Sequence, residues 1–453
     1  MFIDYKRCMS ILYFMTFVLT TCFTFTIYLL VTCYLNTFLL LCIVNITKQP
    51  TLFFAIPVMD ELLTLPRCLD CLSLQSYPNI QIVVCVNQPE SFWNKPEKQH
   101  ICESNAKTLE LLKAFNKLSL TVIDRSSKGK GWTGKKHGVG WARKTVMDFI
   151  SETGNAEDII VSMDADTEFG ENFAESIAET FEQYPKATAL ANPYYHKLSG
   201  DEILDRALLR YEIYMRYYAI NLWRIKNPYC FTAIGSSMAV PLWAYRAIGG
   251  ISPKLSGEDF YFMQKLRKYG SVIVWNDEYT YPATRYSDRV FFGTGPALIK
   301  GSNNDWGSYP MYSRHLFDEI AITYKLIDTL FTVDIPTPMS EFLVETFATK
   351  NLWNPLRENF KTRDRFRKSC AEKVDGLRIL QYLKSKQNAS VNEAIYLTNY
   401  LNTFHKDEIA DKNIHVEELT FEEATIDTLN QLRDMLTEIE NNYRRQYRIV
   451  DWY

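Results

Sequence analysis

The stretch Asp158-Ile-Ile-Val-Ser-Met-Asp-Ala-Asp-Thr167 decides how the rest of the chain is interpreted. A short apolar run leads directly into two carboxylates, Asp164 and Asp166, one residue apart. This pattern predicts a buried strand with both acids at its carboxyl end, the edge where open α/β sheets bind ligands. Two neighbouring carboxylates repel each other unless a cation lies close. A divalent ion that also holds phosphates would relieve the repulsion, so we expect an enzyme for a metal–phosphate substrate such as a sugar nucleotide.

Apolar runs rich in β-forming residues alternate with helical patterns on both sides of this stretch. We expect strands at 51–58, 80–86, 118–123, 158–163, 187–191 and 271–275, with a strand-like run at 229–240. We expect helices at 59–76, 106–117, 139–150, 172–184, 202–223, 242–248 and 259–269. Strands that alternate with helices predict an α/β fold, with a mostly parallel sheet flanked by helices.

The chain divides into three expected segments: an apolar segment at 1–48, an α/β domain at 49–308 and a helical extension at 309–453. No charged residue occurs from Met9 to Thr47, and a helix of that length would measure about 58 Å, nearly twice the bilayer core. Either this segment associates with a membrane, or the start codon was assigned too far upstream. The first alternative predicts an enzyme at the cell membrane with a cytoplasmic catalytic domain, and the second a soluble cytoplasmic enzyme.

Composition limits the classes of partner. A net charge of −3, with no dominant sign, disfavours a nucleic-acid-binding protein, which would present a basic face. Ten cysteines occur without a convincing ligand pattern, which favours buried thiols in a reducing compartment. Sugar nucleotides and reduced cysteines both indicate that the catalytic part is cytoplasmic.

A first polar cluster, Pro57-Val-Met-Asp60-Glu61, follows the first expected strand. A proline-bent backbone and acidic side chains at that position can bind a base or a ribose. Asp60 could equally cap the following helix, and the two roles are compatible.

A second cluster is the Gly/Lys loop, Lys128–Gly138. Its glycines would let the backbone approach a ligand, and its lysines would bind phosphates. The alternative is a solvated basic loop. The Gly/Lys loop is not a Walker motif, because Lys136 follows Gly134-Lys135 where serine or threonine is required.

A third cluster, Ser256-Gly-Glu-Asp-Phe260, places Glu258 and Asp259 at the start of an expected helix. Acids there can simply favour the helix dipole, by about 0.3–1 kcal/mol. A carboxylate near a metal site could also deprotonate an acceptor hydroxyl, which is a weak nucleophile without a positioned base.

Taken in order, these motifs resemble the inverting family-2 glycosyltransferases of the GT-A fold, over about residues 51–300. The matching motifs are Ala55-Ile-Pro-Val-Met-Asp-Glu61, Gln75-Ser-Tyr-Pro-Asn-Ile-Gln-Ile-Val-Val84, Gly131-Trp-Thr-Gly-Lys135 with Gly140, Asp164-Ala-Asp166, Gly235-Ser-Ser-Met-Ala-Val240 with Gly249-Gly250, and Gly257-Glu-Asp259.

The resemblance implies a role for each matched position. Asp166 would bind Mg²⁺ or Mn²⁺, and Asp259 would be the catalytic base, with Glu258 beside it. The implied donor-binding residues are Pro57, Glu61, Asn87, Lys135, Asp164 and Arg289. Arg289 could instead form a structural salt bridge, and His196, near the expected acceptor side, is by default a packed histidine.

The expected activity is therefore transfer of a sugar from a nucleotide diphosphate to a hydroxyl acceptor, with a divalent metal ion and inversion of configuration. A glycan or lipid-linked acceptor of the cell envelope, and membrane association through the N-terminal segment, are expected with it. Two alternatives stay open. A nucleotidyltransferase would need a glycine-rich, arginine-containing loop after the first strand, and Pro57–Glu61 has none. A non-catalytic scaffold would not need the acids at 164, 166, 258 and 259.

Overall fold

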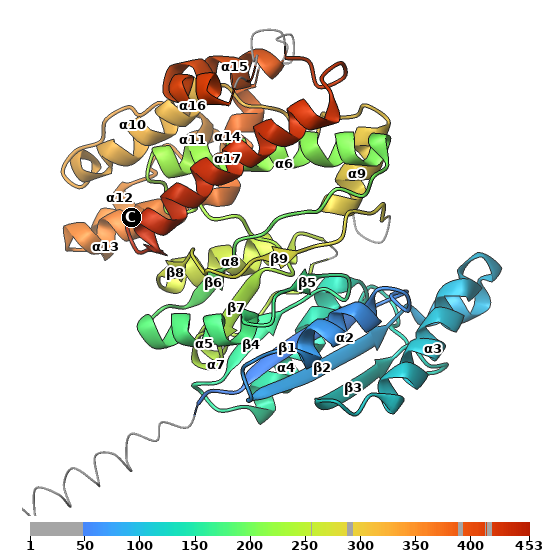
Figure 1. Cartoon of the computed structure of the whole chain (residues 1–453). Helices are drawn as coiled ribbons and strands as arrows, with labels where there is room; N and C mark the ends of the chain where they lie inside the picture. The colour runs from blue at the N-terminus through green and yellow to red at the C-terminus, as the bar shows by residue number, and fades with distance from the viewer. Residues whose placement is uncertain (1–48, 255, 288–292, 388–392, 413, 415–418) are drawn as a thin grey trace, which may run out of the picture. The chain divides into compact units, whose positions relative to one another are not determined.

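An eight-stranded sheet with strand order β10-β8-β6-β7-β4-β1-β2-β3 lies at the centre of the described chain (Figure 1). The structure, a computed structural model, describes residues 49–254, 256–287, 293–387, 393–412, 414 and 419–453. The sheet strands are β1 (Leu52–Val58), β2 (Ile80–Asn87), β3 (Ser119–Arg125), β4 (Ile159–Ser162), β6 (Ala189–Ala191), β7 (Met238–Pro241), β8 (Val272–Ile273) and β10 (Ile449–Val450). A two-stranded ribbon pairs β5 (Glu168–Phe169) with β9 (Thr280–Tyr281).

In these described ranges, four of the seven pairs of neighbouring strands are parallel and three are antiparallel. The predicted α/β fold with a mostly parallel sheet is therefore confirmed. The antiparallel pairs arise because β7 runs against both of its neighbours, β4 and β6, and β10 runs against β8.

Helices cover the sheet and form a second layer beyond it (Figure 1). Those of the α/β part are α2 (Leu65–Ser73), α3 (Gln99–Ala114), α4 (Val139–Thr153), α5 (Phe173–Gln183), α6 (Glu202–Arg224), α7 (Leu242–Ala247), α8 (Glu258–Tyr269) and α9 (Thr294–Ser302), with short 3₁₀ turns η1 (Glu90–Asn94) and η2 (Pro96–Lys98). The later ones are α10 (Arg314–Leu330), α11 (Ser340–Phe347), α12 (Asn354–Asn359), α13 (Arg363–Lys373), α14 (Gly376–Lys386), α15 (Glu393–Phe404), α16 (Lys406–Asp411) and α17 (Ile426–Tyr447).

Strand β1 shows why the first apolar run is continuous rather than alternating. Leu52, Phe54 and Ile56 face one hydrophobic core, whereas Phe53 and Ala55 face another. Successive side chains of a strand point to opposite faces, and both faces of this sheet are covered by helices. Every position in β1 is therefore buried.

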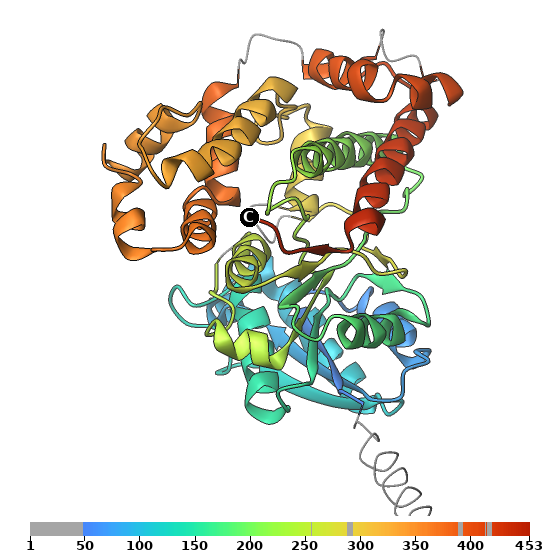
Figure 2. The same ribbon diagram turned by 90° about the vertical axis from the view of Figure 1, so that its left-hand side faces the viewer.

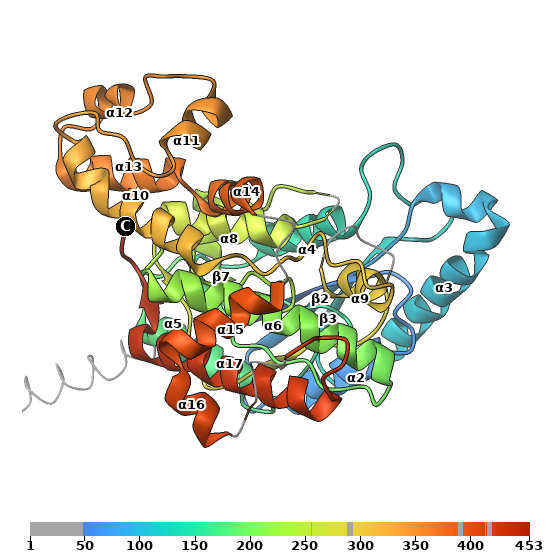
Figure 3. The ribbon, with the colours of Figure 1, turned by 90° about the horizontal axis from the view of Figure 1, so that it is seen from above.

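The helices after α9 share a core with the sheet. Trp223 at the end of α6 stacks with Tyr443 and Tyr447 of α17, with ring planes 7° apart in both pairs. The chain then returns to the sheet, where β10 pairs with β8. Pro50–Tyr453 forms one compact unit, and the division predicted at residue 308 stays a prediction. Figures 2 and 3 show α10–α13 gathered to one side of α6 and α17.

Two local predictions differ from the structure. The helix expected at 59–76 begins only at Leu65, because Asp60 adopts a left-handed backbone (φ 57°) and Pro66 lies in the first turn. In the run at 229–240, only the end belongs to a strand, β7. Its earlier part is a loop that brings the carbonyl of Gly235 to a buried arginine.

The predicted apolar segment 1–48 lies outside the described residues. Within the described part of the chain, no helix combines the length and the apolar character needed to cross a membrane.

Candidate active site

Asp164 and Asp166 follow β4, which lies beside β1 in the sheet. Strand β1 runs parallel to both β4 and β2, so the carboxyl ends of all three strands lie at the same edge of the sheet. Glu61 comes after β1 and, as described below, shares an arginine with Asp166. The predicted collection of acids at this edge of the sheet is thus present.

Arg143, on α4, joins the acids of two motifs. Its Nη2 donates to Asp164 Oδ1 at 2.9 Å, and its Nε donates to Glu258 Oε1 at 3.2 Å. Its Nη1 donates to Ser162 Oγ and to the carbonyl of Gly235. The side chain is only 2% exposed. Burial alone would lower the pKa of Arg143, but the two carboxylates raise it above its ordinary value, so the guanidinium stays charged.

The approach of this guanidinium explains the glycine at position 235. A Cβ atom there would lie 2.5 Å from Nη2 of Arg143, closer than any real contact. A side chain at 235 would therefore push Arg143 away from Asp164.

Asp259 lies in the first turn of α8, after Gly257, which has a left-handed backbone (φ 73°). Its Oδ1 accepts a hydrogen bond from the amide of Phe260 at 2.7 Å. Burial, followed by the charge of Glu258, raises the pKa of Asp259 to about 7, although Arg143 opposes the rise. A carboxylate with a pKa near neutrality can accept a proton and release it under physiological conditions, as a general base must.

Asp166 and Glu61 share Arg285, which follows β9. Arg285 donates to Asp166 Oδ2 from Nε at 2.8 Å and from Nη2 at 2.5 Å, and Nη2 also donates to Glu61 Oε1 at 2.6 Å. Burial, followed by the charge of Glu61, raises the pKa of Asp166 to about 6, against the opposing effect of Arg285. Even with Arg285 in contact, the surroundings of Asp166 therefore favour additional positive charge.

Carboxylate oxygens in such surroundings suit a divalent cation such as Mg²⁺ or Mn²⁺. Asp166 would hold such an ion, with Glu61 and Asp164 close by. Among the described residues, no group of three or more His, Cys, Asp or Glu side chains is arranged to hold a metal ion.

Asn87, predicted to contact a nucleobase, has both ends of its amide engaged within the protein. Nδ2 donates to the carbonyl of Val58 at 2.8 Å, and Oδ1 accepts from Trp132 Nε1 at 3.2 Å. Asn87 thus connects the ends of β1 and β2 to the Gly/Lys loop, and its predicted contact with the donor stays a prediction.

The Gly/Lys loop divides into two parts. The amides of Gly129 and Gly131 each donate at 2.8 Å to the carboxylate of Glu90, so these two amides are bonded within the protein. A Cβ atom at position 131 would lie 2.8 Å from the Glu90 backbone. The second part is open, since Gly134 has a left-handed backbone (φ 64°) and Lys135 is exposed.

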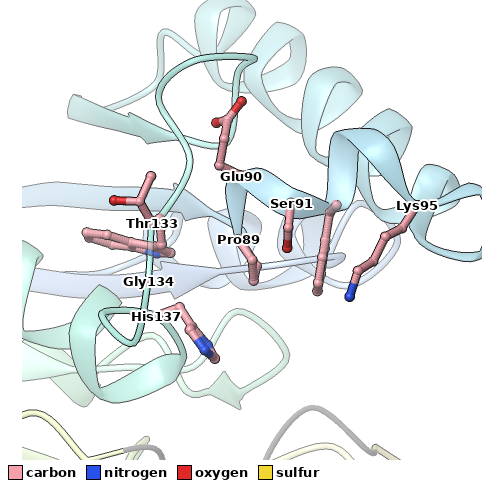
Figure 4. A pocket seen from close by; sticks show the side chains of 9 residues that line it. Pro89, Glu90, Ser91, Lys95, Thr133, Gly134 and His137 are labelled. Atoms are coloured by element: carbon pink, nitrogen blue, oxygen red, sulfur yellow. The ribbon is translucent and has the colours of Figure 1, made fainter.

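A cavity of about 460 Å³ lies between this loop and the segment that follows β2 (Figure 4). Its lining residues are Pro89, Glu90, Ser91, Phe92, Lys95, Trp132, Thr133, Gly134 and His137. This volume is in the range of small-molecule sites, and two aromatic rings belong to its wall.

Three other positions named in the sequence analysis are Pro57, His196 and Arg289. Pro57 is buried inside β1, opposite Cys85 of β2. His196 is fully buried and packed, with Nδ1 3.1 Å from Glu212 Oε1, as the default interpretation expected. Arg289 lies outside the described residues.

Sequence reasoning missed both arginines of the site. Arg143 carried a signal, because positions 143, 146, 147 and 150 form the buried face of α4 and a charge on an apolar face needs a partner. Arg285 carried none, because it lies in a loop 119 residues from Asp166.

Comparison with known proteins agrees with this arrangement. Residues 159–300 match the family described as Glycosyl transferase family group 2. No curated protein matches the chain significantly.

Among solved structures, TarS 1–349 of S. aureus in complex with UDP-GlcNAc is similar at 12% identity, over 87% of this chain and 92% of that chain, with a TM-score of 0.37. The mannosyltransferase PcManGT of Pyrobaculum calidifontis, in complex with GDP-Man and Mn²⁺, is similar at 14% identity, over 72% of this chain and 88% of that one, with a TM-score of 0.31. At these TM-scores the two likenesses carry no argument about function.

The family match covers the strand before Asp164, the loop of Gly235, the acids Glu258 and Asp259, and most of the helix α9. It favours sugar transfer over nucleotidyl transfer and over a non-catalytic scaffold, because it falls on the segment that carries the chemistry. The segment that carries the site, residues 159–300, is therefore similar to the family-2 glycosyltransferases, and the chain is a glycosyltransferase.

Proposed function

We propose that this enzyme moves a sugar from a nucleotide-diphosphate donor to an acceptor hydroxyl in a single displacement that inverts the anomeric carbon. One observation carries the proposal: Asp164 acts on both halves of the site. Burial is the largest cause of the raised pKa of Asp166 and of Asp259, and the charge of Asp164 adds to both. The acid expected to hold the donor and the acid expected to deprotonate the acceptor therefore lie within electrostatic reach of one carboxylate.

On the donor side, the diphosphate would lie beside Asp166, and the exposed Lys135 would approach it from the Gly/Lys loop. The cavity next to that loop would take the nucleobase, because Phe92 and Trp132 can contact its apolar faces. Asp166, with Glu61 and Asp164, would hold Mg²⁺ or Mn²⁺. When bound there, a divalent ion would neutralise the charge that develops on the leaving diphosphate.

On the acceptor side, the Asp259 carboxylate would take the proton of the hydroxyl while its oxygen attacks the anomeric carbon. The bond from that carbon to the diphosphate oxygen breaks as the new glycosidic bond forms, and the nucleoside diphosphate leaves. Arg143 would keep Glu258 and Asp164 in place around this event, because it contacts both.

We also propose that the acceptor is a glycan or a lipid-linked molecule of the cell envelope. The uncharged run Met9–Thr47 supports this proposal, because an apolar segment would hold the enzyme at the membrane where such acceptors are found. The catalytic part would face the cytoplasm, where nucleotide sugars occur. Protease treatment of intact cells tests this topology: digestion of the catalytic domain from outside would overturn it.

Turnover of nucleotide sugars tests the activity directly. A panel of UDP-, GDP- and other nucleotide sugars is screened by thermal shift with Mn²⁺, and the stabilising donors are then assayed for hydrolysis and transfer. We expect turnover that EDTA abolishes and a product whose anomeric configuration, read by NMR, is opposite to that of the donor. Turnover that survives EDTA would overturn the metal requirement, and a retained configuration would overturn the single displacement.

A further inference from the structure

Arg285 occupies one carboxylate oxygen of Asp166, the acid proposed to hold the metal ion. Two of its nitrogens, Nε and Nη2, both donate to the same oxygen, Asp166 Oδ2. Nη2 also reaches Glu61 Oε1, so one guanidinium covers oxygens from two of the acids at this edge of the sheet. The Asp166 side chain is 16% exposed and that of Glu61 is 6% exposed, which leaves little carboxylate surface for another cation.

A guanidinium and a divalent ion compete for such oxygens. Both bind through carboxylate lone pairs, and two positive charges on one oxygen repel each other strongly at low local dielectric. A metal ion that coordinates Asp166 Oδ2 therefore requires Arg285 to move away. The Arg285 side chain is 30% exposed, against 2% for Arg143, so it has room to do so.

The place to which Arg285 would move follows from the substrate. A diphosphate bound beside Asp166 presents oxygens that match the planar fork of an arginine. A divalent ion held by the carboxylates at this edge would complete its shell with oxygens of that diphosphate. The ion and the diphosphate would then arrive together, at the carboxylate that Arg285 vacates.

We propose that Arg285 is a positioning residue that holds the place of the divalent ion in the donor-free enzyme and transfers to the diphosphate when the ion–diphosphate complex binds. This inference rests on the proposed function of the site. It implies that the enzyme binds the metal ion poorly on its own, and that Arg285 both opposes the free ion and supports the complete complex.

The test is a titration of the purified full chain with Mn²⁺, in which electron paramagnetic resonance measures the free ion. Wild type is compared with Arg285→Gln, which removes the charge, and with Arg285→Lys, which keeps a charge without the fork. The control is Arg67→Gln, because Arg67 forms a similar ion pair, at 2.7 Å, with Glu168 outside the site. Each titration is run with Mn²⁺ alone and with Mn²⁺ plus inorganic pyrophosphate as the diphosphate probe.

With Mn²⁺ alone, we expect Arg285→Gln to bind the ion about tenfold more tightly than wild type or the Arg67→Gln control. The Mn²⁺ affinity of Arg285→Lys is expected to lie between those of Arg285→Gln and wild type. With pyrophosphate present, the order reverses, because Arg285→Gln has lost its contact with the diphosphate.

Equal Mn²⁺ affinity in wild type and Arg285→Gln would overturn the place-holding role, and equal pyrophosphate affinity would overturn the transfer to the diphosphate. If thermal unfolding shows that Arg285→Gln does not fold, the same comparison is made with Arg285→Lys, whose unchanged Mn²⁺ affinity would count against the proposal. Failure of the proposed function is distinct, because it appears as an absence of nucleotide-sugar turnover in wild type.

Discussion

Two clusters of carboxylates in this molecule differ in the positive charge that surrounds them. Among the described residues, the arginines near the sheet-edge acids Glu61, Asp164, Asp166, Glu258 and Asp259 are Arg143 and Arg285. Between α6 and α17, Glu212 and Glu440 meet three arginines, Arg216, Arg433 and Arg444, all at most 1% exposed.

The pKa values follow this difference. At the sheet edge, burial raises the pKa of Asp259 to about 7 and that of Asp166 to about 6. Burial would also raise the pKa of Glu212, but His196 and the arginines lower it to about 2. Acids that are fully paired contribute to the fold, whereas acids left with unbalanced charge are available to bind a cation or to accept a proton.

The largest expected effect is on catalysis. Asp259→Asn removes the proposed base, and we expect transfer to fall about 10²–10⁴-fold while thermal shift still detects the donor. Asp70→Asn is the control, because Asp70 is an exposed acid that pairs with Lys117 on the surface. Near-normal turnover in Asp259→Asn would show that another group is the base.

The second effect is on stability. Glu212→Gln removes the buried counter-charge of Arg433 and leaves Arg216 with Glu440 alone, and we expect the free energy of unfolding in urea to fall by about 3–5 kcal/mol. Glu202→Gln, on the exposed side of the same helix, should change it by less than about 1 kcal/mol. Equal effects of the two substitutions would mean that the buried network does not stabilise the fold.

The third effect is on the metal requirement. Asp166→Asn keeps the shape of the side chain but removes its charge, so Mn²⁺-dependent donor binding should weaken about 10–100-fold. Glu168→Gln, which removes an acid paired with Arg67 and Lys197, should leave it unchanged. If Mn²⁺ strengthens donor binding equally in Asp166→Asn and wild type, Asp166 does not hold the ion.

The smallest effect is the pH dependence of wild type. Because only the ionised form of Asp259 accepts a proton, kcat/KM should rise about tenfold from pH 6 to pH 8 and then level off. The stability of the fold changes with pH in the opposite direction. Because the folded state favours the protonated form of Asp259, the contribution of this acid to stability is lost as pH rises through about 7. Flat kcat/KM over this range would refute the assignment.

For Glu212 the sign is reversed. Its depressed pKa stabilises the fold above the ordinary glutamate pKa, and this contribution is lost only as pH falls towards about 2. Acid should therefore unfold wild type at a lower pH than a variant with a weakened network, such as Arg433→Gln.

Much of the fold could be predicted from local pattern. Buried β1, β2 and β4 are apolar runs, and α4, α5, α6 and α8 repeat apolar residues at helical spacing, so each element is encoded by its own residues. The two-residue strand β10 could not be found in this way, because it exists only through its pairing with β8.

The candidate site divides in the same manner. Asp164, Asp166, Glu258 and Asp259 follow strands or begin a helix, so their place at the sheet edge could be predicted. Asn87 and half of the Gly/Lys loop also contact other parts of the protein, which the sequence did not predict, and their expected contacts with a ligand stay predictions. Their polar groups satisfy one another across loops, and such pairing leaves no periodic trace in the sequence.

Strand ends and helix starts are local properties, so the acids that gather at one edge of the α/β sheet can be recognised from the chain's residues alone. How the charge of those acids is balanced depends on contacts between distant parts of the fold. Arg143 reaches Glu258 across 115 residues, and Arg285 reaches Glu61 across 224. The charge left over at the site, and with it the capacity to hold a cation and to accept a proton, depends on burial and on these distant pairings.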